Sequence, residues 1–454
     1  MVKQLSISGF RGFGEKQTIS FSLPNGEKNG SGLNIITGAN NSGKTTIIEA
    51  LRGFNNTDTP SFSEGKRNIE TGGKVELKVL DENNYEHVIK TVSTGGSSTD
   101  RIGNFGLRFY IVQSRRAIEF EFHKNTSNRE FYISSSLGIN NLRTPSLNNF
   151  TYRIFQIEEN RDKFDPVLSQ VLGDDFEWTI EQRDSGSYYI KYMKGGISHS
   201  AEGIGDGIWS IFTICAALYD APENSTVVID EPELSLHPDF QKKLMILLME
   251  YSRRIQIIIC THSPYFINWE AISNGANLIR VVKEETKSKC YGLNEESRYK
   301  ISGILNDINN PHTLGLDANE IFFLNDGIIL VEGQEDVLIY KRIAGALEEK
   351  FNGNFFGWGA GGAHKIPMFL SIFKSLGYKK VVALYDGDKK EVAEIIKKQF
   401  PEYCFIILKE DDIRDKSHRE IKGKNGIADE KGDIKPENKE YMKSVIQEIN
   451  NYLV

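Results

Sequence analysis

The sequence predicts an α/β protein made of two successive units, each with helices covering a mainly parallel sheet. Three observations lead to this fold class. Helices and strands alternate from residue 203 to residue 260, and a second alternation occupies 327–408. A glycine-containing loop, 37–46, separates the apolar segment 33–36 from the helical segment 47–51. A strand, a glycine loop and a helix in that order are typical of a phosphate-binding α/β unit.

The composition is that of a globular protein. The chain has 454 residues, 39% of them hydrophobic and 26% charged, and this length suggests about two to four domains. The net charge of −7 gives no overall basic footprint for nucleic acid, so any DNA contact is expected to be local. The four cysteines form no Cys-x-x-Cys pair, and we expect neither a signal peptide nor a membrane span. We expect a cytoplasmic protein with reduced thiols and no membrane partner.

The domain boundaries are predicted from changes in composition. We place the first domain at 1–300, with a helical or irregular insertion at about 114–200. The weakly helical stretch 301–326 is expected to be a linker or boundary. The second domain is expected to occupy 327–454, where its regular alternation implies a core of its own.

The first chemical motif is the loop Gly38–Thr46, which reads Gly-x-x-x-x-Gly-Lys-Thr-Thr. Its glycines allow backbone amides to converge on phosphates, and the start of the following helix adds a positive dipole. Lys44 is expected to reach the β- and γ-phosphates of ATP, and the Thr45 hydroxyl to bind Mg²⁺. A chance match in a turn is the alternative, which the flanking strand and helix disfavour. The predicted ATP-binding residues of this loop are Gly38, Asn40, Asn41, Ser42, Gly43, Lys44, Thr45 and Thr46.

Two apolar strands further along end in polar residues. Segment 225–229 runs into Asp230 and Glu231, and segment 255–260 is followed by His262. The carboxyl ends of parallel strands meet at one edge of a sheet, beside the phosphate loop. Asp230 is therefore expected to contact Mg²⁺, and Glu231 to orient or deprotonate the attacking water. His262 is a candidate γ-phosphate contact, whereas a histidine in such a place is more often structural.

Two strands of the second unit also end in acids. One runs into Glu332, and the next into Asp386 and Asp388, with Asp336 one helical turn beyond the first. On neighbouring parallel strands these carboxylates would share one edge, and such clusters suit Mg²⁺ or Mn²⁺. Two such ions can drive phosphodiester cleavage. An Asp-Gly turn is also common without any ligand, so the Asp386-Gly387-Asp388 motif alone does not decide between these readings.

Together the motifs of the first unit resemble the ABC-type ATPase head of RecF, SMC proteins and the OLD nucleases. The resemblance implies that Gln113 contacts the nucleotide. It also places Gly203 and Gly205 where the family keeps its signature motif, although the stretch departs from the LSGGQ form. A homodimer or higher homo-oligomer through the ATPase heads, with ATP between them, is implied as well. The segments that carry the resemblance are Phe10–Phe13, the phosphate loop, Ile229–Glu233 with Leu236–Pro238, and Thr261–Pro264.

The motifs of the second unit resemble a TOPRIM domain. Val331–Asp336 comes first, Gly359–Gly362 then precedes a helix, and Asp386–Asp388 follows. An ABC-type head followed by a smaller TOPRIM domain resembles the OLD family, which includes the Gabija nuclease and retron-associated effectors. The resemblance implies an ATP-gated, metal-dependent DNA endonuclease of bacterial anti-phage defence, with a defence-system protein or a retron reverse transcriptase and its DNA as an operon partner. The implied metal ligands are Glu332, Asp336, Asp386 and Asp388, and three of them, Glu332, Asp386 and Asp388, are also the implied catalytic residues.

One acid of the TOPRIM pattern is not at its usual place. The family has a further acid after the next strand, and here the candidates to replace it are Asp412 and Asp415, with Lys409 or Lys416 as the nearby basic residue. Two alternatives therefore stay open. One is a RecF-like ATP-driven DNA clamp or sensor with a non-catalytic TOPRIM domain. The other is a TOPRIM ribonuclease or primase-like enzyme.

Overall fold

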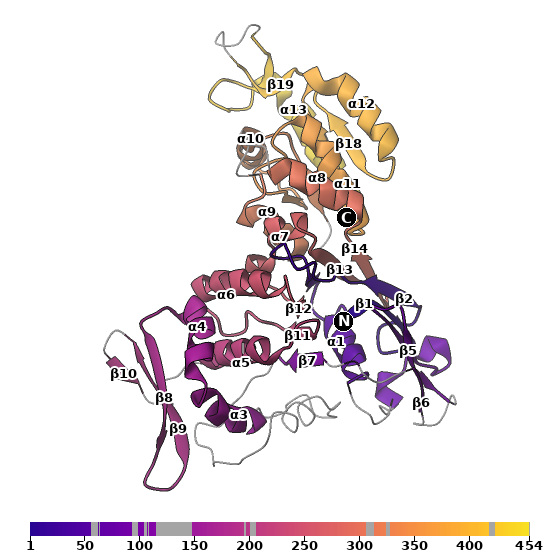
Figure 1. Ribbon diagram of the computed structural model, residues 1–454. Coiled ribbons are helices and arrows are strands. Elements are labelled where there is room, and N and C mark those ends of the chain that lie inside the picture. The colour runs from indigo at the N-terminus through magenta and orange to yellow at the C-terminus, as the bar shows by residue number, and fades with distance from the viewer. Residues whose placement is uncertain are drawn as a thin grey trace. The chain divides into compact units, whose positions relative to one another are not determined.

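The fold is taken from a computed structural model. It divides into two compact units, Met1–Gly292 and Leu293–Val454, each with its own hydrophobic core (Figure 1). The predicted linker, 301–326, lies within the second unit. The residues that the structure describes are 1–55, 62, 64–92, 99–103, 107, 109–114, 148–194, 197–199, 206–305, 313–323, 327–416 and 423–453.

A six-stranded sheet forms the centre of the first unit, in the order β14-β13-β3-β12-β11-β7. All neighbouring pairs are parallel except β13 with β14. The three innermost strands are buried along their whole length, which is why they read as continuous apolar runs in the sequence. The bounds are β3 (Leu33–Thr37), β7 (Phe109–Val112), β11 (Thr226–Asp230), β12 (Gln256–Cys260), β13 (Asn277–Glu284) and β14 (Lys287–Gly292).

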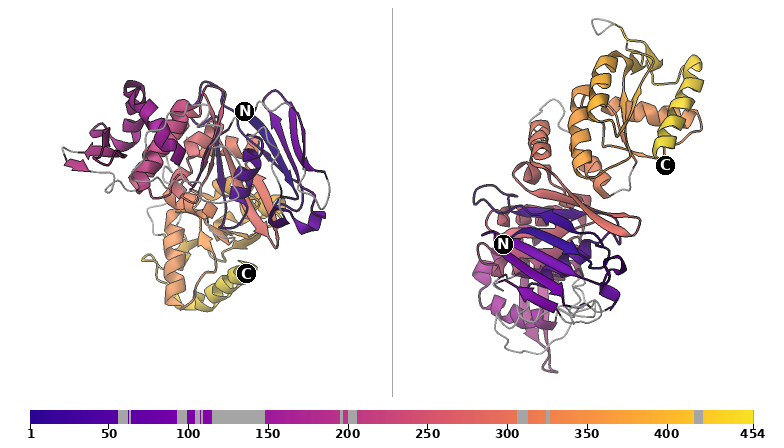
Figure 2. Two further views of the ribbon diagram at one scale, coloured as in Figure 1. Left: turned by 90° about the horizontal axis from the view of Figure 1, so that it is seen from below. Right: turned by 90° about the vertical axis from the view of Figure 1, so that its right-hand side faces the viewer.

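A second, antiparallel sheet in the order β2-β1-β4-β5-β6 shares one core with helix α1 and the central sheet. The right-hand view of Figure 2 looks onto its indigo and violet strands. Helix α1 begins directly after the phosphate loop, so the packing of both sheets fixes the position of that loop. The bounds are β1 (Val2–Ser8), β2 (Gln17–Ser20), α1 (Lys44–Arg52), β4 (Glu76–Asp81), β5 (Glu86–Thr91) and β6 (Thr99–Ile102).

The rest of the first unit consists of helices α5–α7 and the described part of the predicted insertion. That part forms two helices and an antiparallel three-stranded sheet, β10-β9-β8. It is joined to α5 by an aromatic cluster around Phe164, Trp178 and Phe212, and by a buried ion pair between Arg153 and Asp220. The bounds are α3 (Asn148–Glu158), α4 (Arg161–Leu172), β8 (Phe176–Gln182), β9 (Tyr188–Lys194), β10 (Ile197–His199), α5 (Asp206–Asp220), α6 (Pro238–Tyr251) and α7 (Trp269–Ser273).

The second unit is built on a four-stranded parallel sheet, β16-β15-β17-β18. The charge-rich stretch after β18 contains β19 and β20, which form a separate two-stranded parallel sheet. The parallel α/β core predicted for both units is confirmed. The bounds are α8 (Glu295–Leu305), α9 (Leu316–Glu320), β15 (Ile328–Leu330), α10 (Gln334–Ala346), β16 (Asn354–Phe355), α11 (Ile366–Ser375), β17 (Val381–Tyr385), α12 (Lys390–Gln399), β18 (Cys404–Ile407), β19 (Asp412–Arg414), β20 (Gly426–Ala428) and α13 (Lys439–Leu453).

Short 3₁₀ turns complete the two units. The turns are Glu64–Lys66, Ile69–Thr71, Pro264–Phe266, Ile321–Phe323, Ala363–Lys365, Gly387–Lys389 and Pro436–Asn438.

No helix among the described residues has both the length and the apolar character that a bilayer span requires.

Candidate nucleotide pocket and acidic cluster

The phosphate loop is wrapped tightly against its neighbours. Gly38 (φ 143°) and Gly43 (φ 119°) both lie at backbone angles that other residues rarely adopt. A Cβ at Gly38 would collide with the carbonyl oxygen of Val281, and one at Gly43 would lie 2.8 Å from Ser288 Oγ. The Ser288 hydroxyl also donates a 2.6 Å hydrogen bond to the Ser42 carbonyl. The β13–β14 hairpin therefore holds the loop in its wrapped form.

The loop opens onto a pocket of about 680 Å³. Two of the predicted ATP-binding residues, Gly38 and Ser42, do not line this pocket. The Ser42 side chain is buried. Gly203 and Gly205 lie outside the described residues. Residues on the wall that the sequence analysis did not single out include Arg11, Glu49, Arg52 and Lys283. The predicted residues that do line the pocket are Asn40, Asn41, Gly43, Lys44, Thr45, Thr46, Gln113, Asp230, Glu231 and His262.

The Lys44 ammonium is held at the mouth of the loop. It donates 2.9 Å hydrogen bonds to the carbonyl oxygens of Gly38 and Ala39. Burial lowers the pKa of Lys44, while the carboxylates at and just after the end of β11 act in the opposite direction. A partly buried cation at the end of a glycine loop is well placed to meet a phosphate.

Glu231 takes an unusual backbone conformation where β11 ends. Its φ of 49° lies in the left-handed region, and its amide donates a 2.8 Å hydrogen bond to the carbonyl of Cys260 on β12. A non-glycine residue in this region carries strain of roughly 1–3 kcal/mol, and such strain gathers at functional sites. Both acids line the pocket: Asp230 is buried at the end of β11, and Glu231 lies at the turn just beyond it.

Glu233 connects the end of β11 to the residues that follow β12. Its carboxylate accepts 2.6 Å and 2.8 Å hydrogen bonds from the His262 amide and the Thr261 hydroxyl. Burial raises the pKa of Glu233. Burial and the nearby Lys44 charge lower the pKa of His262, which favours a neutral imidazole on the pocket wall. The sequence analysis quoted Glu233 only as part of a motif, because its partners are adjacent in space and not in sequence.

Arg11 forms another part of the wall that sequence reasoning left without a role. Its guanidinium lies 2.8 Å from Glu49 of α1. Its carbonyl accepts a 2.7 Å hydrogen bond from Asn68, and its φ of 52° is left-handed. These contacts hold a cation beside the phosphate loop. In the sequence, the Phe10–Phe13 motif was the feature that could have pointed to Arg11 as part of the nucleotide pocket.

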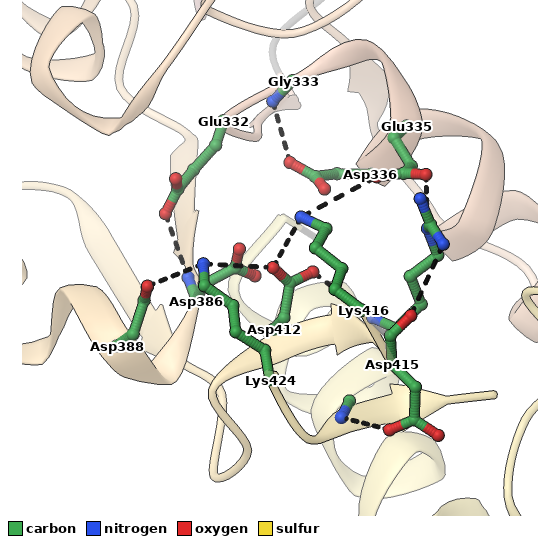
Figure 3. Close-up of polar contacts among 12 residues, drawn as sticks. Glu332, Gly333, Glu335, Asp336, Asp386, Asp388, Asp412, Asp415, Lys416 and Lys424 are labelled. Carbon is green, nitrogen blue, oxygen red and sulfur yellow. Dashed lines mark hydrogen bonds and ion pairs between the residues drawn. The ribbon is translucent and has the colours of Figure 1, made fainter. Parts of the chain in front are cut away.

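In the second unit the structure brings the predicted acids together at one sheet edge (Figure 3). Glu332 lies just beyond β15 and Asp386 just beyond β17, and the Asp386 amide donates a 3.2 Å hydrogen bond to Glu332 Oε1. Asp336 stands in the first turn of α10, where its carboxylate accepts a 2.8 Å hydrogen bond from the Gly333 amide. The parallel pairing of β15 with β17 produces this convergence.

The glycine segment 359–362 holds the end of β15 in place. The amide of Ala360 donates to the Val331 carbonyl at 2.9 Å, and that of Gly362 donates to the Glu332 carbonyl at 2.8 Å. A Cβ at Gly359, whose φ is 85°, would lie 2.7 Å from the Gly333 backbone. The close approach of two backbones and the positive φ explain why a glycine is needed here.

Burial and mutual repulsion set the charge state of the cluster. Burial, together with neighbouring carboxylates, raises the pKa of Asp386 to about 9 and that of Asp336 to about 7. Burial also raises the pKa of Glu332. Burial acts on Asp388 in the same sense, but hydrogen bonds from Lys424 and Lys389 outweigh it and lower the Asp388 pKa. Buried oxygen ligands that resist ionisation next to one another are the kind that a divalent cation stabilises.

Asp412 of β19 completes this cluster, and Asp415 does not. The Asp412 carboxylate is fully buried and accepts hydrogen bonds from Lys416 (2.6 Å) and Lys424 (3.3 Å). Asp415 instead pairs with Lys435 at 2.7 Å, away from the other acids (Figure 3). Of the two candidates for the missing acid, the structure therefore places Asp412 beside Asp386.

The oxygen donors fit Mg²⁺ or Mn²⁺ in their chemistry, because they are hard carboxylates gathered at one sheet edge. Within the described ranges, however, no three His, Cys, Asp or Glu side chains are already arranged to hold a metal ion. Cationic side chains contact Asp388 and Asp412 instead. Ion binding at this cluster thus requires side chains to move.

Removing the buried charge of Asp412 is expected to destabilise the second unit. Asp412→Asn leaves Lys416 and Lys424 without their shared negative charge, and breaking a buried ion pair on one side is costly. Because both lysines keep some exposure, we expect a loss of about 2–3 kcal/mol in the free energy of unfolding. Chemical denaturation of the full chain measures it, with Asp415→Asn as the matched control at under about 1 kcal/mol. Equal losses in the two variants would contradict the assignment.

Comparison with known proteins agrees with this geometry. The family model described as "AAA domain, putative AbiEii toxin, Type IV TA system" matches residues 33–268, just over half of the chain. The chain belongs to this AAA ATPase family. A second model, "Overcoming lysogenization defect protein-like, TOPRIM domain", matches residues 323–388. The protein is thus an OLD-family chain in which an AAA ATPase domain precedes an OLD-like TOPRIM domain, and these domains imply use of nucleotide and divalent metal.

Two curated relatives match the OLD-family chain. The Septu protein PtuA of Bacillus thuringiensis is 25% identical over 311 residues, which cover 60% of this chain and 74% of that protein. An OLD nuclease of Thermus scotoductus (strain ATCC 700910 / SA-01) is 26% identical over 193 residues, 40% of this chain but only 35% of the nuclease. Among solved structures, an SMC head bound to the C-terminal winged-helix domain of ScpA aligns with a TM-score of 0.42 at 15% identity, covering 66% of this chain and 99% of that one. The SMC head domain of Thermotoga maritima aligns at 0.38 and 17% identity, covering 64% and 99%.

Proposed function

We propose that this chain is an ATP-dependent, divalent-metal-dependent DNA endonuclease that acts in bacterial anti-phage defence. The observation that carries the proposal is the convergence of Glu332, Asp336 and Asp386 at one edge of the TOPRIM sheet. The names of the two relatives, an OLD nuclease and a Septu protein, support the nuclease activity and the defence context.

The pocket of the first unit would bind and hydrolyse ATP. Lys44 would exchange its two loop carbonyls for the β- and γ-phosphates, and Thr45 and Asp230 would hold Mg²⁺. Glu231 would orient the attacking water, with the neutral imidazole of His262 donating to the γ-phosphate. Gln113 lines the same pocket and would contact the nucleotide. Gly203 and Gly205 of a second copy would complete the site, which makes a homodimer through the ATPase domains part of the proposal.

The acidic cluster of the second unit would cleave DNA. Glu332, Asp336, Asp386 and Asp388 would hold divalent ions, Mg²⁺ or Mn²⁺, with Asp412 in place of the missing acid. Bound there, a divalent ion would supply Lewis acidity and an activated water for phosphodiester hydrolysis. The chain's own part is to fix the donors: Gly333 orients Asp336, and the Asp386 amide orients Glu332. Partly exposed Lys416 and Lys424 offer cations to a DNA phosphate at the same edge.

A second function has one observation in its favour. Lys424 contacts both Asp388 and Asp412, which is also what a non-catalytic TOPRIM domain would need in order to fold without a metal. The chain would then be an ATP-driven DNA clamp or sensor. This alternative keeps the ATPase roles of Lys44 and Glu231 and removes only the cleavage step.

A cleavage assay separates these functions. The full chain is incubated with supercoiled, linear and single-stranded DNA and with RNA, in Mg²⁺, Mn²⁺ or EDTA, with and without ATP. Metal-dependent cutting of DNA is the expected result, and ATP is expected to change its rate. DNA binding without cutting in every condition would favour the clamp, and cutting of RNA alone would favour a ribonuclease.

Lys44→Ala tests whether ATP controls cleavage, since this substitution should remove the effect of ATP on the cleavage rate.

A further inference from the structure

A row of alternating charges crosses the acidic cluster. Lys424 Nζ lies 2.7 Å from Asp388 Oδ2 and 3.3 Å from Asp412 Oδ2. Lys416 Nζ lies 2.6 Å from the same Asp412 oxygen and 3.8 Å from Glu335 Oε2. Two ammonium groups therefore converge on a single buried carboxylate oxygen, and one of them reaches on to Asp388 (Figure 3).

The backbone holds these two lysines side by side. Lys416 and Lys424 form an isolated antiparallel bridge and exchange two hydrogen bonds, of 3.1 Å and 3.2 Å, between their amides and carbonyls. Residues paired in this way present their side chains on the same face. The main chain thus places both side chains on the face next to Asp412, and each ammonium group reaches that carboxylate through its own flexible stem.

The two lysines serve different acids. Asp412 has no exposed surface and needs a counter-ion, which Lys416 alone provides at the shorter distance. Asp388 is more exposed, and it is contacted both by Lys424 and by its sequence neighbour Lys389. If Lys424 moves away from both acids, Asp412 therefore still keeps its ion pair with Lys416.

We propose that Lys424 is a latch on the acidic cluster: its ammonium occupies the ligand oxygens of Asp388 and Asp412, and a divalent ion enters only when it swings away. The proposal deepens the proposed function and rests on it for the role of Asp388 as a metal ligand. Since an ammonium and a divalent cation repel each other at such distances, the latch weakens metal binding in the resting chain.

The test is the affinity of the full chain for Mn²⁺, measured from the signal of free Mn²⁺ by electron paramagnetic resonance. Lys424→Met keeps an unbranched side chain, one atom shorter than lysine, and removes its charge, and it should bind Mn²⁺ about tenfold or more tightly than the wild type. The matched control is Lys435→Met, which removes an equally long 2.7 Å ion pair outside the cluster and should leave the affinity unchanged. Equal or weaker binding by Lys424→Met would overturn the latch.

A measurement on the wild type does not depend on the folding of a variant. Labelling with an amine-reactive reagent, read by mass spectrometry, should modify Lys424 several-fold faster in saturating Mn²⁺ than in EDTA, with Lys435 unchanged. An unchanged rate at Lys424 would also overturn the proposal. Neither test uses cleavage. Tighter Mn²⁺ binding by Lys424→Met in a chain that cuts no DNA would refute the nuclease and leave the latch, and cutting without any difference in Mn²⁺ affinity would do the reverse.

Discussion

Glu231→Gln is expected to lower ATP turnover by about 10²–10⁴-fold, the usual contribution of a general base, while ATP stays bound. Glutamine keeps the size of the side chain and its place on the pocket wall, but it cannot accept a proton from water. Glu231 lies at the left-handed turn just beyond β11 and lines the pocket beside Asp230. Because Asp230 is the proposed Mg²⁺ contact, it is not expected to replace Glu231 as the base. Phosphate release at saturating ATP measures the turnover.

Glu223→Gln is the matched control, because Glu223 is an exposed acid before the opposite end of β11. It should hydrolyse ATP at the wild-type rate. Near-normal hydrolysis by Glu231→Gln would remove its role as the water-orienting base. If two ATPase domains close on the retained ATP, Glu231→Gln with ATP should also sediment as a dimer, whereas a monomer would count against the proposed assembly.

Asp386→Asn is expected to abolish metal-dependent DNA cleavage and, in EDTA, to stabilise the chain. The Asp386 carboxyl is buried against Asp336, Glu332 and Asp412, so its charge is unfavourable unless a cation is near. Asparagine has the same shape without that charge, and the free energy of unfolding should rise by about 1–3 kcal/mol. Thermal or chemical unfolding in EDTA and a plasmid-nicking assay provide the two measurements.

The control for this prediction is Glu394→Gln, which neutralises an exposed acid on α12 and should change neither result. Wild-type cutting by Asp386→Asn would remove the acidic cluster from the cleavage reaction. A destabilised Asp386→Asn with intact structure elsewhere would instead contradict the account of mutual repulsion among the buried acids.

Much of the fold could be predicted from the sequence, because buried parallel strands leave a strong local signal. The apolar runs that became β3, β11, β12, β15 and β17 are each followed within a few residues by a predicted site residue or by the phosphate loop. Parallel strands all deliver their carboxyl ends to one edge, so the residues just after the runs were enough to identify Glu231 and Asp386, and the glycine-loop motif after β3 identified Lys44.

The rest of the site depends on contacts that leave no pattern in one sequence. Asp412 and Asp415 are three residues apart in the same charged stretch, and only the course of β19 decides which of them faces the acids. Glu233 acts through a hydrogen bond to the backbone of another strand. Lys424 reaches Asp388 because of a bridge with Lys416, a pairing with no periodic signal.

The hydrogen bonds of Lys44 to its own loop have a consequence for the kinetics of nucleotide exchange. A lysine already anchored to two carbonyls, in a loop braced by Ser288, has little conformational freedom left to lose when a phosphate replaces those partners. When nucleotide binds, Lys44 exchanges its hydrogen bonds to the loop carbonyls for contacts with phosphate, and when nucleotide leaves, it does the reverse. The loss of conformational entropy is small in both steps. Such a loop would load and release nucleotide quickly, so the time that ATP stays bound would be governed by the closing of a second subunit over it and not by the loop itself.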